Sequence, residues 1–154
     1  MSGELPIHGR ARIWIWVWTL LVALGCQVRL ATAYDEIIDR GASDLHTEIA
    51  AFVGKMATLS GKPEGTYDLN QGVYPEFLAK VSTLRIRAAA APKNQITVKL
   101  LDELSGNLER LRLLHQMGKE RGLNKALAGP ALSAIDVNCS SIIQYELAKR
   151  RDES

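Results

Sequence analysis

Cysteine is scarce in this chain of 154 residues and occurs only as Cys26 and Cys139. The sequence has no Cys-x-x-Cys-His haem attachment motif, no paired-cysteine zinc spacing, no glycine-rich phosphate loop and no Gly-x-Ser-x-Gly nucleophile elbow. No histidine follows a glutamate by three residues, so the Glu-x-x-His pairs of di-iron bundles are missing too. We therefore expect neither an enzyme nor a cofactor.

The chain also lacks an excess of charge in its main part. The formal net charge is +2. The first 33 residues supply all of this charge, because they carry Arg10, Arg12 and Arg29 against Glu4. All three tryptophans lie in these 33 residues as well. A neutral body with few aromatic rings has little to hold phosphates or stack on bases, so nucleic acid is not an expected partner.

The first 33 residues have the pattern of an export signal. Arg10 and Arg12 precede an uncharged, apolar run at residues 13–25, and Arg29 ends the apolar character. A membrane-spanning helix needs about 20 apolar residues, so this run is short for a permanent anchor. We predict an export signal peptide at 1–33, which indicates a bacterial protein that leaves the cytosol for the periplasm or the medium.

Two processing sites compete within this leader. Ala31 and Ala33 form a small-x-small triplet that predicts cleavage by a leader peptidase between Ala33 and Tyr34. The stretch that ends at Cys26 resembles a bacterial lipobox, but Leu24 stands where that motif has a small residue. We expect cleavage after Ala33. The alternative is a membrane-tethered lipoprotein with a lipid on Cys26.

Residues 34–154 are expected to form a single helical domain. Apolar residues recur every three or four positions, which predicts helices at about 35–60, 73–91, 94–118 and 130–150. Asp35 suits the first N-cap and Pro130 the first turn of the last helix, while the polar connection at 61–72 reads as mobile. The expected apolar stripe of the third helix runs through Ile96, Leu100, Leu104, Leu108, Leu111 and then Leu114 or His115.

These helices have similar lengths, and the link between the second and third is short. A short link forces neighbouring helices to lie antiparallel. The predicted fold class is therefore all-α: an antiparallel up-down-up-down four-helix bundle after a cleaved N-terminal signal. Its stripe in the last helix includes Cys139, expected as a small buried hydrophobe, and Leu147. The basic run Lys149 to Arg151 is interpreted as a solvated helix end.

Charge is distributed unevenly along the body, with acids in excess over residues 34–76 and bases in excess over 77–154. We interpret this as complementarity between neighbouring helices, which is worth a few tenths of a kcal/mol per exposed pair. The alternative is a basic interaction face for an anionic lipid or partner. Its residues would be Arg85, Arg87 and Lys93.

A few side chains offer candidate chemistry. Non-covalent haem would need two axial ligands, here His46 or Met56 in the first helix with His115 or Met117 in the third. We instead interpret His115 as a seam histidine with one ring nitrogen bonded. Two carboxylate pairs are candidates for acid–base couples: Asp35 and Asp39, which share a helix face, and Asp102 and Glu103, which are adjacent in the sequence. We interpret both pairs as exposed acids.

The sequence thus predicts an exported, non-catalytic binding or accessory protein of the bacterial cell envelope. The expected partner is another envelope protein. A membrane becomes a partner only if Cys26 is lipidated or the leader is retained. The alternative functions are a haem or small-ligand carrier and an envelope inhibitor of the immunity-protein type.

The processing sites lead to a first prediction. We expect the exported protein to start at Tyr34 without a lipid, because the small-x-small triplet is the better peptidase substrate. Intact-mass spectrometry measures this directly. Cys26→Ser should be exported and cut in the same way. A diacylglyceryl group on Cys26 would instead show that the chain is a lipoprotein.

Overall fold

The chain divides into two units, Met1–Leu30 and Ala31–Ser154, and the computed structural model describes residues 32–151 of the second unit. The regular elements of these residues are all helical, which confirms the all-α prediction. Two short 3-10 helices, η1 and η2, lie in the connections. The elements in chain order are α2 (Glu36–Thr58), η1 (Pro63–Gly65), α3 (Tyr67–Asn70), α4 (Val73–Ala90), α5 (Gln95–Met117), η2 (Lys119–Arg121) and α6 (Lys125–Arg151).

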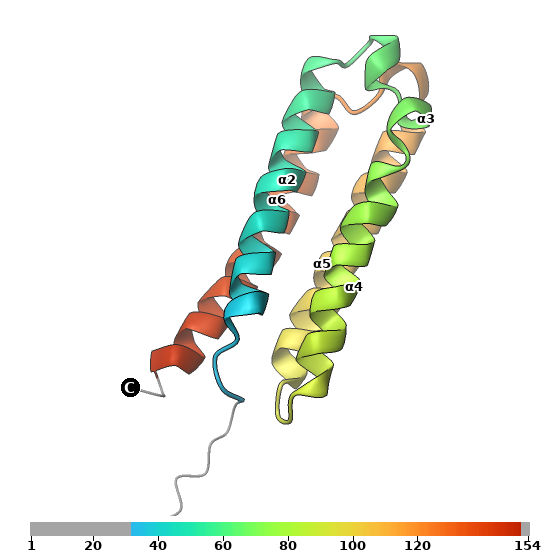
Figure 1. Cartoon of the computed structure of the whole chain (residues 1–154). Coiled ribbons are helices and arrows are strands. Elements are labelled where there is room, and N and C mark those ends of the chain that lie inside the picture. The colour runs from blue at the N-terminus through green and yellow to red at the C-terminus, as the bar shows by residue number, and fades with distance from the viewer. Residues whose placement is uncertain (1–31, 152–154) are drawn as a thin grey trace, which may run out of the picture. The chain divides into compact units, whose positions relative to one another are not determined.

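The four long helices lie side by side along their lengths (Figure 1). α2 packs against α6, α4 against α5, and α5 against α6, while a smaller contact joins α2 to α4. The short helix α3 lies near the end where α4 begins and α5 finishes (Figure 1). The start of α2 and the end of α6 lie at the opposite end of the long helices, close to the α4–α5 turn (Figure 1).

One apolar stripe from each long helix builds the core, which is why periodicity in the sequence located these helices well. In α2 the stripe that the sequence period predicts is buried at most positions, with Phe52 and Leu59 only partly buried and Val53 buried instead. The predicted members are Ile38, Ala42, Leu45, Ile49, Phe52, Met56 and Leu59. In α4 the expected stripe matches the buried residues. These are Tyr74, Phe77, Val81, Leu84 and Ala88.

The stripe expected for the first half of α5 is wrong by one residue. Ile96 is exposed and Leu100 only partly buried, whereas Thr97 and Leu101 are fully buried. Successive steps of four residues rotate a stripe by about 40° each, so the expected run drifted off the buried face. The observed stripe alternates steps of four and three residues and stays aligned with the core. Its members are Thr97, Leu101, Leu104, Leu108, Leu111 and His115.

The expected start of the last helix near Pro130 is also wrong. α6 begins at Lys125, and Asn124 caps it with a side-chain oxygen that accepts the amide of Leu127 at 3.0 Å. Pro130 therefore lies inside the helix, where it removes one backbone hydrogen bond. Pro130 is the sixth residue of α6, beyond the free amides of the first turn, so the helix continues past the proline with that one bond missing. Pro130 thus correctly indicated a helix in this region, but the helix begins five residues earlier, at Lys125.

The connection at 61–72, which the sequence predicts to be the most mobile one, contains η1 and α3. The Gly61 amide donates to the Arg121 carbonyl at 3.0 Å, which ties this connection to the one that follows α5. Gly122 has φ 60° and ψ −152°, a conformation that non-glycine residues avoid. A Cβ on Gly122 would lie 2.1 Å from the Gly65 carbonyl oxygen.

This contact leads to a second prediction. Gly122→Ala should lower the free energy of unfolding by at least about 1–3 kcal/mol, because the new methyl group meets backbone and the φ angle is strained. Gly54→Ala is the matched control. Gly54 lies in the exposed interior of α2 with no neighbour within 4 Å of an added Cβ. That change should stabilise the protein by up to about 1 kcal/mol. Urea unfolding of both variants tests the contact, and equal effects would contradict it.

Candidate functional site

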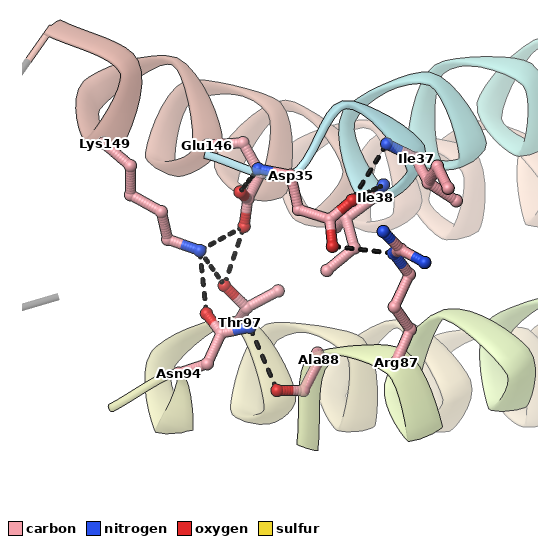
Figure 2. Close-up of polar contacts among 9 residues, drawn as sticks. All are labelled: Asp35, Ile37, Ile38, Arg87, Ala88, Asn94, Thr97, Glu146 and Lys149. Atoms are coloured by element: carbon pink, nitrogen blue, oxygen red, sulfur yellow. Dashed lines mark hydrogen bonds and ion pairs between the residues drawn. The ribbon is translucent and has the colours of Figure 1, made fainter. Parts of the chain in front are cut away.

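A cluster of buried polar side chains joins the end of α6 to the start of α5 (Figure 2). We call Asn94, Thr97, Glu146 and Lys149 the polar cluster. The Lys149 ammonium donates to Asn94 Oδ1 at 2.7 Å, to Thr97 Oγ1 at 3.1 Å and to Glu146 Oε1 at 2.5 Å. The side chains of Lys149 and Glu146 are 1% and 0% exposed. Two full charges are therefore removed from water at this end of the structure.

The carboxylate of Glu146 completes the polar cluster. Its Oε1 also accepts the Thr97 hydroxyl at 2.9 Å, and its Oε2 accepts the backbone amide of Asp35 at 3.1 Å. The Asn94 amide group donates to the Ala88 carbonyl at the end of α4. No buried side-chain nitrogen or oxygen in the described part of the chain lacks a partner. The polar cluster is thus fully hydrogen-bonded, as buried charges require.

The polar cluster corrects two expectations for the end of α6. Lys149 is not part of a solvated helix end, and Glu146 takes the buried position that was expected for its neighbour Leu147. Cys139 and Ile142 lie on the same buried face. Glu146 follows Cys139 by seven residues and Lys149 follows Ile142 by seven, so both charged residues lie on this face as well. This seven-residue repeat was the available sequence signal, and it was missed because charged residues were assumed to face water.

Asp35 acts as a helix cap and an ion-pair partner. Its Oδ1 accepts the amides of Ile37 and Ile38 at the start of α2, as a capping carboxylate does (Figure 2). Its Oδ2 accepts Arg87 Nε at 2.7 Å from the last turn of α4. Asp39 accepts the Tyr34 hydroxyl at 2.8 Å. Asp35 and Asp39 therefore engage different partners and do not form an acid–base couple.

The residues of the expected basic face lie near the α4–α5 turn. Arg85 donates to Asp102 on α5 at 2.5 Å, and Arg87 pairs with Asp35. The hydrogen bond and charge of Asp102 raise the pKa of Arg85. Lys93 lies in the turn itself with a positive φ of 61°. The arginines thus join α4 to two other helices, and Asp102 and its neighbour Glu103 do not act as a pair.

His115 lies in the core near α3, and both of its ring nitrogens are bonded, where one was expected. Nε2 is 2.9 Å from the Gly65 carbonyl, and Nδ1 is 2.8 Å from the Tyr74 hydroxyl. A carbonyl only accepts, so Nε2 carries a proton and donates to Gly65, while Nδ1 and the Tyr74 hydroxyl share the second hydrogen bond. Burial and the nearby Tyr67 raise the pKa of Tyr74. Through its hydrogen bond to Gly65, His115 thereby connects η1 to α5.

The candidate haem ligands do not converge. His115 has no ring nitrogen left for iron, Met117 is 74% exposed, and Met56 is fully buried in the apolar core. His46 Nε2 contacts Asp136 on α6 at 2.7 Å. Within residues 32–151 no group of three or more histidine, cysteine or acidic side chains is placed to hold a metal ion.

The thiol and the processing residues have distinct surroundings. Cys139 is buried as expected, and burial raises the pKa of its thiol to about 12. Cys26 and Ala31 lie outside the described residues. Ala33 is exposed and precedes α2 outside any helix. The Arg150 guanidinium lies 5.4 Å from the centre of the Tyr34 ring, and the hydrogen bond to Asp39 raises the pKa of Tyr34.

An open groove lies between α3, α4 and α5 and has a volume of about 670 Å³. Arg112 and Glu109 of α5 form its polar wall, with Arg112 Nε 2.8 Å from Glu109 and a guanidinium nitrogen 3.4 Å from the Tyr67 hydroxyl. Most of its lining is apolar. The remaining lining residues are Gln71, Gly72, Pro75, Leu78, Ala79 and Ser82.

Comparison of the chain with protein-family models, with curated proteins and with solved structures found no match. By length and composition α6 passes the test for a membrane-crossing helix. The core helix of a soluble protein can be equally long and apolar, and α6 buries Ile135, Ile142 and a paired charge against its neighbours, while 28% of its apolar stretch is buried.

The polar cluster leads to a third prediction. Lys149→Met should lower the free energy of unfolding by about 3–5 kcal/mol, because it leaves the Glu146 carboxylate buried and without its cation. Lys80→Met is the matched control, since Lys80 pairs with Glu48 at the surface with both side chains about half exposed. That change should cost less than about 1 kcal/mol. Urea unfolding measures both, and equal losses would show that the Lys149 pair is not buried.

Proposed function

We propose that this chain is exported across the bacterial inner membrane, is cleaved after Ala33, and acts in the cell envelope as a non-catalytic protein-binding module. In this proposal the four long helices form an up-down-up-down bundle. The groove between α3, α4 and α5 holds the partner. The groove is the single observation on which the binding role depends.

Helix pairing supports the bundle. Short connections at 91–94 and 118–124 join α4 to α5 and α5 to α6, which favours antiparallel neighbours. Each long helix also packs on two others, so the contacts close into a ring. Such a body presents rigid outer helix faces, a suitable base for a recognition surface.

Contacts at the start of the folded unit support processing after Ala33. Tyr34 is held by its hydroxyl on Asp39 and by Arg150 beside its ring. Ala33, the residue before it, is exposed and non-helical. A leader peptidase needs an accessible stretch of chain on the N-terminal side of its cut, and loops or termini of this kind supply it. Within residues 32–151, Tyr34 is the first residue with such a side-chain contact, and it directly follows the expected cleavage point.

The groove has the composition of a protein-recognition surface. Pro75, Leu78 and Ala79 give it an apolar lining, and Arg112 and Glu109 give it a polar border. An apolar centre with a polar rim is typical of protein interfaces. A site for a small molecule would enclose most of its ligand, whereas this groove is open to solvent. We therefore favour a protein partner over a haem or small-ligand carrier.

The placement of perturbed groups favours binding over catalysis. Enzymes gather side chains with shifted pKa values around a pocket. Here Tyr74 and Cys139, whose pKa values are strongly raised, lie in the core and not among the groove residues. In the groove, hydrogen bonds to Glu109 and Tyr67 raise the pKa of Arg112, which keeps this side chain a cation. The titratable groups of the polar cluster likewise bond one another. The groove offers contact surface without a poised acid or base.

Site-specific photocrosslinking tests the binding role and is the fourth prediction. A photoreactive phenylalanine analogue at Ala79 should crosslink an envelope protein in living cells, because Ala79 lines the groove. Ile86 is the matched control, since it is exposed on α4 about two turns further along and is not in the groove. The Ala79 product should disappear when Leu78 and Ser82 are replaced by Glu. Equal crosslinking from both positions, or none from Ala79, would contradict the groove as the binding surface.

A further inference from the structure

Glu146 is the only buried carboxylate in the described part of the chain, and it faces the point where the chain enters α2. Its Oε1 is engaged by Lys149 and Thr97. Its Oε2 accepts the Asp35 amide at 3.1 Å (Figure 2). A carboxylate oxygen has two lone pairs, so Oε2 has the capacity for a second donor.

The backbone nitrogen of Tyr34 lies one residue before that amide. Consecutive residues span at most about 3.6 Å, so this nitrogen lies within about 7 Å of Glu146 Oε2. Residue 34 is also fixed in place. Asp39 holds its hydroxyl at 2.8 Å, and the Arg150 guanidinium lies 5.4 Å from the centre of its ring.

We propose that Glu146 is the binding site for the α-ammonium group that cleavage after Ala33 creates on Tyr34. This inference rests on the cleavage point of the proposed function. Water hydrolyses the amide bond between Ala33 and Tyr34, the carboxylate stays on Ala33, and the amine leaves on Tyr34 and carries a proton at neutral pH. A neutral amide in the precursor thus becomes a cation beside a buried carboxylate, and an opposite charge at this range is attractive.

Most of the other charged groups at this end are paired with one another. Lys149 pairs with Glu146, Arg87 with Asp35, and Arg40 with Glu36. Asp39 bonds the neutral Tyr34 hydroxyl and adds a second carboxylate near the new terminus. Arg150 is the opposing cation on α6, and Lys93 lies in the α4–α5 turn. The facing residues of α5, Asn94 and Thr97, are neutral.

This contact would make leader removal part of folding. In the precursor the chain continues through residue 34, and Glu146 Oε2 accepts the amide of Asp35. After cleavage, the free terminus would join the polar cluster and link the start of α2 more firmly to the end of α6. The processed protein should therefore be more stable than any form in which the same nitrogen is blocked or displaced.

Three purified chains test the inference, which is the fifth prediction: one beginning at Tyr34, one beginning at Ala33, and one beginning at N-acetylated Tyr34. Residues Ala31–Ser154 form a compact unit with their own core, so all three are suited to thermal unfolding. At pH 6 the α-amine is charged. The chain that starts with free Tyr34 should melt about 2–5 °C above the other two. The Ala33 chain keeps the charge but moves it by one residue.

Glu146→Gln should remove the difference between free and acetylated Tyr34, and Glu36→Gln, an exposed acid in the first turn of α2, should preserve it. If Glu146→Gln is too unstable to measure, the Ala33 chain still decides the question. Equal melting temperatures for the three chains would overturn the inference. Mass spectrometry of the exported protein tests the cleavage point separately, so failure of the proposed processing would be distinguishable.

Discussion

The buried ion pair of Glu146 and Lys149 fixes how the ends of the long helices meet. Through it the last turns of α6 bond the first residues of α5 and the residue that begins α2, and Asn94 extends the contact to the end of α4. A buried pair adds little net stability, because desolvation offsets most of the attraction. It does demand one arrangement, since any other register would leave a charge buried without a partner. The way in which these helix ends meet is therefore determined more by the contacts of the polar cluster than by apolar packing.

A second polar contact fixes the opposite end. His115 bonds the Gly65 carbonyl and the Tyr74 hydroxyl, and Gly122 packs closely on Gly65. Together they hold the 61–72 connection and the α5–α6 connection against each other. Between these two ends the apolar stripes supply the core. The groove with Arg112 at its wall lies beside the His115 end, while Tyr34, which follows the proposed cleavage point, lies at the Glu146 end. The proposed binding surface and the proposed processing site thus lie at opposite ends of the described unit.

Surface charge serves mainly to join the helices. Arg87 reaches the acid that caps α2, Arg85 reaches Asp102 on α5, and Lys80 pairs with Glu48. Each exposed pair contributes at most about 1 kcal/mol, so these contacts select neighbours more than they add stability. Two of these pairs, Arg87 with Asp35 and Lys80 with Glu48, join the basic part of the sequence to the acidic part and so give a physical account of the unequal charge. Anionic recognition is not needed to explain it.

The sequence by itself determined the all-helical class, because a period near 3.6 in apolar residues has few other structural solutions. It also located α2, α4 and α5 and most of their buried faces. It did not locate the start of α6, since Pro130 is tolerated inside the early helix once Asn124 supplies the cap. Nor did it predict the polar cluster. The burial of Glu146 and Lys149 depends on Thr97, which is 49 residues from Glu146 in the chain, and only tertiary structure brings these residues together. A charged side chain can be buried only where such partners surround it. These partners come from distant parts of the chain, so no local sequence pattern predicts the burial.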